Sequence, residues 1–352
     1  MRTSVAGGSL KCAAAAVAML WLNAACAMAQ EKHAIGFNDM IAMHRIAEAD
    51  LSPDGQWVAY TIATPDMEAN RNATNIWMAP VTGGEAIQLT RTGKDSSPKW
   101  SPDGKTIAFL SARSGGSQVY LLSLEGGEAH PVSRLSTGAD MVKWSPDGKA
   151  ILFTSSVFPD CKDDACNSKR DEENEKNPVK AHVAEQLLYR HWNHWNEGKR
   201  SHLFVTASDG SGEPKDLTAG ANYDVPPDQR GEESDINFSP DAKEICFTAV
   251  TDKVEATSTN GDLFIVQVAG GEPKRITTQP GFDGNPVYSP DGKYIAYHAQ
   301  LTAGYEADRW RVMLYDRATG KNENLTESSF DRSAQNLAWS PDSRTIYFLA
   351  EN

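Results

Sequence analysis

Short runs in which apolar and polar residues alternate recur along most of the chain, and the spacing typical of amphipathic helices is nearly absent. Two examples are Thr106–Leu110 and Tyr294–Tyr297. A period of two residues is typical of a β-strand, because successive side chains point to opposite faces of the sheet. The pattern therefore predicts an all-β protein made of many short strands.

One short motif follows these strands repeatedly: an aromatic residue or Leu, then Ser-Pro-Asp, and then in most copies Gly. The serines of its six copies are Ser52, Ser101, Ser145, Ser239, Ser289 and Ser340. Pro presets the φ angle of a type I turn, Asp accepts hydrogen bonds from the turn backbone, and Gly adopts the left-handed conformation that closes a bulged hairpin. Each copy is expected to be a tight turn between two strands, with its Asp as a structural acceptor.

The copies recur at intervals of roughly 44 to 51 residues, with one interval about twice as long, and a second hairpin follows the motif in each complete unit. Two hairpins make one four-stranded blade, so the repeat predicts a β-propeller. We expect residues 30–352 to hold five complete blades and the first hairpin of a sixth. On this interpretation the propeller is incomplete at its C-terminus.

The long interval predicts an insertion in the third blade, at residues 157–200. Its first half, 160–177, is highly charged and is expected to form a mobile loop. Residues 178–190 carry apolar side chains at helical spacing and predict a helix.

Residues 1–29 have the form of a secretory signal peptide. An apolar stretch at 13–22 is too short to span a bilayer, and Ala27–Ala29 supplies small residues for cleavage. A lipid anchor on Cys26 is disfavoured, because Asn23 stands where an aliphatic residue is expected. The sequence predicts a secreted or periplasmic protein with no membrane span.

The cysteines that remain after cleavage lie in an oxidising compartment. Cys161 and Cys166 are close together in a polar segment and are expected to form a disulfide, whereas Cys246 lies in a strand-like run and is expected to be a small buried apolar residue. A zinc site that combines these cysteines with His182 matches no known ligand spacing. No metal and no cofactor are therefore expected.

The chain is acidic, with a formal net charge of -13 at pH 7. Nucleic-acid binding requires a concentrated basic surface, so nucleic acid is excluded as a partner. We interpret the acidity as a contribution to solubility.

The segment Met40–Ile46, which leads into the first motif and its serial copies, resembles the propeller of the prolyl oligopeptidase family of serine peptidases. The stretches Leu188–Trp192 and Glu197–Phe204 resemble the insertion of dipeptidyl-peptidase V-like members. The resemblance covers essentially all of the mature chain. It implies a propeller that caps an active site and admits only short peptides.

Members of that family carry an α/β-hydrolase domain after the propeller, with a Ser nucleophile in Gly-x-Ser-x-Gly. No such string occurs in the 352 residues. We therefore expect the catalytic domain to be absent, no catalytic residue to be present, and the chain to be inactive alone. The alternative is a stand-alone TolB-like periplasmic propeller that binds a protein partner at its face, but about 20 residues between the cleavage site and the first motif leave no room for the separate domain that TolB carries there.

The end of the insertion holds an unusual cluster of aromatic and charged residues: Trp192, Trp195 and Glu197, with His191 and His194. The resemblance implies that this segment helps to hold the free amino terminus of a substrate, and a carboxylate beside aromatic rings suits an ammonium group. The alternative is that the tryptophans anchor the insertion to its blade and that Glu197 is solvated. The two histidines lack a third ligand at any informative spacing.

Overall fold

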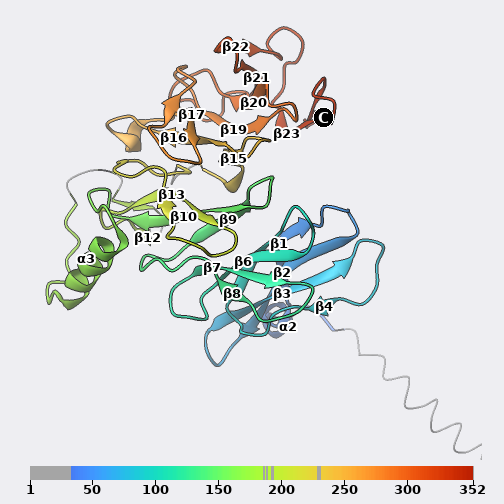
Figure 1. The fold of residues 1–352 in the computed structure, drawn as a ribbon, viewed down its shortest axis with the longest axis vertical. Coiled ribbons are helices and arrows are strands. Elements are labelled where there is room, and N and C mark those ends of the chain that lie inside the picture. Colours follow the sequence, from blue (N-terminus) through green and yellow to red (C-terminus); the bar gives the residue numbers. More distant parts are fainter. Residues whose placement is uncertain (1–32, 185–186, 188, 192–193, 228–230, 352) are drawn as a thin grey trace, which may run out of the picture. The chain divides into compact units, whose positions relative to one another are not determined.

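A computed structural model describes residues 33–184, 187, 189–191, 194–227 and 231–351 (Figure 1). The chain divides into two units, residues 1–43 and 44–352. In the described part of the first unit, helix α2 (Phe37–Ala42) buries none of its residues. The signal peptide expected at 1–29 lies outside the described residues, and no helix within them is long and apolar enough to cross a bilayer.

The second unit contains four-stranded antiparallel sheets, each with its strands in chain order, a two-stranded hairpin after the last of them, and another two-stranded hairpin in the insertion of the third. We number these sheets as blades. Blade 1 contains β1 (Arg45–Leu51), β2 (Trp57–Asp66), β3 (Arg71–Pro80) and β4 (Ile87–Gln88). Blade 2 contains β5 (Asp95–Trp100), β6 (Thr106–Ser111), β7 (Gln118–Ser123) and β8 (His130–Pro131). Blade 3 contains β9 (Asp140–Trp144), β10 (Ala150–Val157), β13 (Arg200–Ala207) and β14 (Lys215–Asp216).

The remaining blades follow the same order. Blade 4 contains β15 (Ile236–Phe238), β16 (Glu244–Val250), β17 (Gly261–Gln267) and β18 (Lys274–Arg275). Blade 5 contains β19 (Asp283–Tyr288), β20 (Tyr294–Ala299), β21 (Arg311–Asp316) and β22 (Lys321–Asn324). The last hairpin pairs β23 (Gln335–Trp339) with β24 (Ile346–Leu349). The fold is the all-β propeller of four-stranded blades that the repeat predicts.

The Ser-Pro-Asp turns connect the first two strands of each blade through one repeated set of hydrogen bonds. In blade 2 the Ser101 hydroxyl donates to the Asp103 carboxylate at 2.6 Å, and the backbone N–H of Thr106 donates to the Ser101 hydroxyl at 2.9 Å. The Ser-to-Asp bond recurs in all six copies. This bond and the backbone N–H donors lower the pKa of Asp103, so the turn Asp is an ionised structural acceptor.

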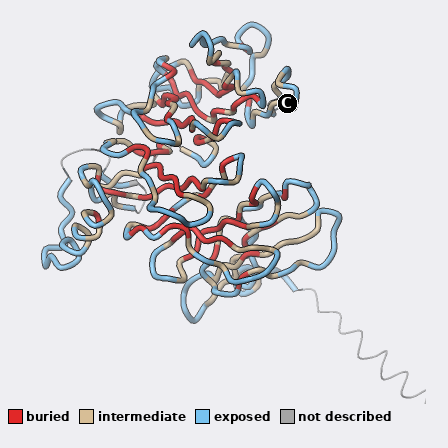
Figure 2. The backbone as a smooth tube through the Cα atoms, in the orientation of Figure 1, coloured by how far each residue is buried: buried red, intermediate tan, exposed pale blue. Residues whose placement is uncertain are grey.

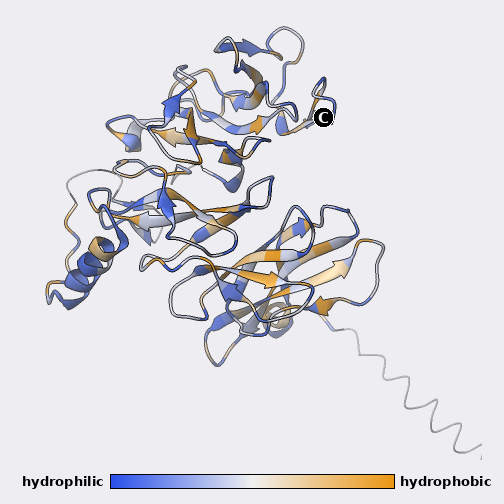
Figure 3. Ribbon diagram, viewed as in Figure 1, coloured by the Kyte–Doolittle hydropathy of each residue, from blue (hydrophilic) through white to orange (hydrophobic). Residues whose placement is uncertain are grey.

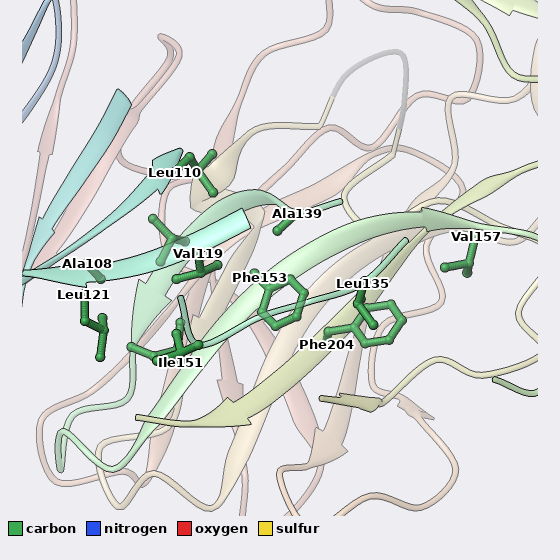
Figure 4. Packing of buried hydrophobic residues seen from close by; sticks show 12 residues of the cluster. Ala108, Leu110, Val119, Leu121, Leu135, Ala139, Ile151, Phe153, Val157 and Phe204 are labelled. Atoms are coloured by element: carbon green, nitrogen blue, oxygen red, sulfur yellow. The ribbon is translucent and has the colours of Figure 1, made fainter. Parts of the chain in front are cut away.

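The core lies between neighbouring blades, and successive residues of one strand enter different cores. On β10, Phe153 packs with residues of blade 2, whereas Leu152 packs with residues of blade 4. Figure 4 shows Phe153 and Phe204 in the core that blade 3 shares with blade 2. The centroids of their rings lie 5.6 Å apart. Burial follows the central strands of blades 2 to 5 (Figure 2), because the sheets of these blades pack against neighbouring blades.

The tryptophans that precede three of the turns also join adjacent blades through hydrogen bonds. The indole N–H of Trp144 donates to the backbone carbonyl of Lys99 in blade 2 at 3.1 Å. The same bond links Trp100 to Asp50 and Trp339 to Val287. The motif therefore fixes contacts between blades as well as the hairpin within each blade.

The first strand of most blades contains a bulge that the sequence pattern did not predict. One residue there adopts a left-handed conformation and shifts the register of pairing with the second strand; these residues are Glu48, Ser97, Met141, Asn285 and Asn336. Each lies four positions before the Ser of its turn. Bulges increase the local twist and bend of a strand.

The insertion holds a helix in a different place from the one predicted. Helix α3 spans Asp164–Lys176, in the segment expected to be a mobile loop, and residues 178–184 are not helical. Asp163 caps the helix by accepting the N–H of Cys166 at 2.9 Å, and its surface is hydrophilic (Figure 3). In the described residues 178–184, Val179 and Val183 are exposed, so their helical spacing has no surface to pack against and does not suffice for a helix.

Candidate functional site: the blade-three insertion

The insertion leaves blade 3 after β10 and returns at β13, and a group of interactions at its base holds α3 in place. Two cations lie over the ring of Phe158, with the Arg170 guanidinium carbon 4.7 Å and the Lys199 ammonium 5.1 Å from its centroid. Lys199 also forms a 2.7 Å ion pair with Asp171 of α3. The base of the insertion is therefore a fixed platform.

Two further links strengthen this base. Arg170 donates two hydrogen bonds to the carboxylate of Asp160, at 2.6 and 2.7 Å, and this pairing lowers the pKa of Asp160. Cys161 and Cys166 are joined by a disulfide, with their Cα atoms 5.4 Å apart. The bridge connects the chain after β10 to the first turn of α3.

Where the insertion rejoins blade 3, Arg200 ties it to the loops of the next blade. Its guanidinium lies 2.7 Å from the carboxylate of Asp224 and 3.1 Å from that of Glu255. Burial disfavours the charge of Arg200, but the two carboxylates outweigh burial and raise its pKa. The charge at this junction is compensated.

Shortly before β13 the insertion forms a short hairpin of β11 (Arg190–His191) and β12 (His194–Trp195). Glu197 follows it in a left-handed conformation with a φ angle of 50°. The turn is closed by the N–H of Lys199, which donates to the carbonyl of Asn196 at 2.8 Å. This conformation places Glu197 in a tight bend two residues after Trp195.

His182 brings Trp195 and Glu197 into one cluster. Its imidazole stacks on the Trp195 ring, with centroids 4.0 Å apart and ring planes 3° from parallel. Its Nδ1 atom lies 3.6 Å from Oε1 of Glu197. Tyr189 stacks at 5.8 Å from the Trp195 centroid, and the Arg190 guanidinium carbon lies 5.5 Å from it. We call these five residues the insertion cluster.

The structure brings together two of the three substrate-binding residues predicted from the sequence, Trp195 and Glu197. The third, Trp192, lies outside the described residues. From the sequence, His182 was considered only as a zinc ligand. In the described part of the chain, no group of three or more His, Cys, Asp and Glu side chains has the arrangement of a metal site. Its stacking partner lies 13 positions away, across a segment without regular repeat, so spacing gave no signal.

Comparison with known proteins agrees with this architecture. The family of the Tricorn protease N-terminal β-propeller domain matches residues 64–227. Dipeptidyl-peptidase 5 of Porphyromonas gingivalis is 30% identical over 324 residues, which cover 88% of this chain and 45% of that protein. The uncharacterized peptidase YuxL of Bacillus subtilis is 30% identical over 283 residues, which cover 79% of this chain and 33% of that protein.

Solved structures show the same fold. An acylaminoacyl peptidase of Pyrococcus horikoshii superposes with a TM-score of 0.62 at 15% identity, covering 88% of this chain and 43% of that one. The β-propeller domain of the Trilobed protease from Pyrococcus furiosus superposes with a TM-score of 0.54 at 14% identity, covering 88% of this chain and 78% of that domain.

The fold and the sequence matches define a β-propeller of the kind found in these peptidases. The chain is similar to the propeller portion of proteins named dipeptidyl-peptidase 5 over 78–88% of its own length. The resemblance noted in the sequence is thereby confirmed. The chain spans less than half the length of the curated relatives that it matches.

Proposed function

We propose that this chain is the substrate-gating propeller of a secreted or periplasmic dipeptidyl-peptidase-like enzyme, and that its insertion binds the free amino terminus of short peptides. In this proposal Glu197 accepts the ammonium group and Trp195 supplies an aromatic wall beside it. The catalytic Ser, Asp and His belong to a hydrolase domain that these 352 residues do not encode. The propeller limits which peptides reach that domain.

The observation that carries the proposal is that one side chain, His182, lies against both the Trp195 ring, at 4.0 Å, and the Glu197 carboxylate, at 3.6 Å, so that both groups border one place. The Glu197 side chain is 55% exposed, so its carboxylate is available to a ligand. A carboxylate and an aromatic face together favour a cation over a neutral group. The relatives named as dipeptidyl-peptidase 5 support a peptide as the ligand.

Direct binding to the purified chain tests this proposal without any catalytic activity. Alanyl-alanine amide carries a free ammonium group, and its N-acetylated form does not. We expect calorimetry to detect binding of the free-amine peptide only, and Glu197→Gln to weaken it about tenfold or more, because a hydrogen bond between charged groups is lost.

Glu125→Gln is the matched control, because Glu125 is also an exposed carboxylate that pairs with a basic side chain, Lys105 at 3.0 Å. This variant should bind like the wild type. Equal affinity for the acetylated peptide, or equal losses in the two variants, would refute the role of Glu197.

A further inference from the structure

The imidazole of His182 occupies the place that a ligand cation would take in the insertion cluster. It covers one face of Trp195 at 4.0 Å and lies 3.6 Å from Glu197, so it meets both groups that would recognise an ammonium ion. When protonated, an imidazole over an aromatic ring and beside a carboxylate is the same arrangement as a bound ammonium group. His182 therefore stands in for a ligand.

Few interactions keep the His182 side chain in this position. Its side chain is 44% exposed, and its separation from Glu197 is longer than a hydrogen bond. It belongs to residues 178–184, which form neither helix nor strand. Among the described residues its side chain contacts only Trp195 and Glu197 through ring stacking or charge. A ligand can therefore displace it without unfolding a helix or a strand.

We infer that His182 is an intramolecular competitor for the peptide amino terminus, which closes the cluster in the absence of substrate. This inference rests on the proposed function and adds a regulatory element to the same site. Binding requires the imidazole to leave the face of Trp195 and the carboxylate of Glu197. Part of the binding free energy is spent on that displacement, so the apparent affinity is reduced.

The test compares variants of His182 in the binding assay with alanyl-alanine amide. His182→Ala removes the competitor, and we expect it to bind the peptide about five- to tenfold more tightly than the wild type, as the loss of one ring-stacking contact would imply. His182→Lys supplies a permanent cation and should bind more weakly than His182→Ala. His130→Ala, which alters an exposed histidine on β8 of blade 2, should match the wild type.

A second measurement follows the side chain itself. Stacking on the indole shifts the imidazole carbon-bound proton of His182 upfield in the NMR spectrum, and saturation with the peptide should move this resonance toward its value in an unstructured chain. The assignment comes from its loss in His182→Ala. A resonance that keeps its upfield position in the saturated complex shows that His182 stays in place and overturns the inference.

The outcomes separate this inference from the proposed function. Binding that depends on Glu197 but is unchanged or weakened in His182→Ala overturns only the competitor role. Absence of binding in the wild type together with binding in His182→Ala supports it strongly. Absence of binding in both, with melting curves that show folded protein, refutes the proposed function and this inference with it.

Discussion

Asp283 in blade 5 occupies the position that Asp95 occupies in blade 2, six residues before the Ser of the turn, yet the two carboxylates have opposite surroundings. Asp95 pairs across the sheet with Ser111, whose hydroxyl donates to it at 2.6 Å, and Arg113 donates at 2.8 Å. Asp283 pairs with Ala299, and Leu301 takes the place of Arg113. Both aspartates are fully buried.

The different partners move the two pKa values in opposite directions. Burial would raise the pKa of Asp95, but the hydrogen bonds from Ser111, Thr92 and Arg113 outweigh it and lower that pKa. Asp283 accepts a bond from Gln279, but its Oδ2 atom has no hydrogen-bond partner among the described residues. Burial therefore raises the pKa of Asp283 to about 7.

We expect the stability of the wild type to fall between about pH 4 and pH 7 because of Asp283. Its folded pKa lies above its unfolded value of 3.8, so the proton stabilises the fold fully below the unfolded pKa, and this contribution is lost as pH rises through the folded pKa. Asp283→Asn replaces the carboxyl group by a neutral amide of the same size and shape. Urea unfolding measures the free energy of unfolding of both proteins. Between pH 5 and pH 8 this free energy should rise in the variant relative to the wild type, by on the order of a few kcal/mol.

Asp95→Asn is the matched control with the opposite sign. The folded pKa of Asp95 is lowered, so its stabilising contribution is present above the unfolded pKa and is lost as pH falls through the folded pKa. This variant should be less stable than the wild type at pH 8. Parallel pH profiles for the two variants would contradict the assignment of a neutral Asp283.

The bond from Trp144 to the carbonyl of Lys99 gives a second prediction. Trp144→Phe removes the indole N–H and leaves the Lys99 carbonyl without this donor, which should lower the free energy of unfolding by about 1 kcal/mol beyond the loss of ring area. The control is Trp57→Phe, because the half-buried Trp57 indole donates no hydrogen bond within the described residues. Equal costs of the two substitutions, measured by denaturant unfolding, would show that the bond between blades contributes nothing.

The sequence contained most of the fold because the turn motif encodes its own geometry. Ser-Pro-Asp, followed by Gly in four of its six copies, specifies a local hairpin, and the repetition of the motif specifies the propeller. The bulges were not predictable, since Glu48, Met141 and Asn285 have no residue type in common, and the demand for a left-handed residue comes from the bend of the first strand.

The insertion was harder to predict because a cap, a disulfide and an ion pair, which apolar periodicity does not report, decide where its helix forms. The helix formed at Asp164–Lys176, where a cap and a disulfide fix its first turn and Lys176 pairs with Glu172 one turn back. Trp195 and Glu197 could be singled out by composition. His182 could not be joined to them, since only the folded segment brings the three side chains together.

The disulfide gives a third prediction. Replacing Cys161 and Cys166 by Ser should cost about 2 kcal/mol, as expected for the closure of a short loop, and the loss should be concentrated in α3. Hydrogen exchange of residues 164–176 measures the loss of stability in α3. Mass spectrometry of a non-reduced digest verifies the bridge. A reductant should change the exchange of the wild type only, because the double variant has no disulfide to reduce and Cys246 is a buried free thiol. Unchanged exchange in the double variant would contradict a stabilising bridge.

The two turns that lack glycine give the last prediction. Ala242 and Ser343 adopt left-handed φ angles of 58° and 60°, where the glycine of the blade 2 turn, Gly104, has 71°. A side chain strains this conformation by roughly 1–2 kcal/mol, whereas glycine has a larger entropy in the unfolded chain. Ala242→Gly should therefore stabilise the protein by about 0.5–1 kcal/mol.

Ser343→Gly should give almost no gain, although it relieves the same strain. The Ser343 hydroxyl accepts the backbone N–H of Asp291 in the blade 5 turn at 3.0 Å, and the loss of this bond costs about as much as the strain. Gly104→Ala is the reverse test: an added Cβ would meet only Pro53, at an ordinary 3.8 Å, so its cost is conformational and about 1 kcal/mol. Thermal melts of the three variants should rank Ala242→Gly above Ser343→Gly above Gly104→Ala. Equal gains for the two glycine variants would show that the Ser343 hydroxyl does not couple the turns of blade 5 and the last hairpin.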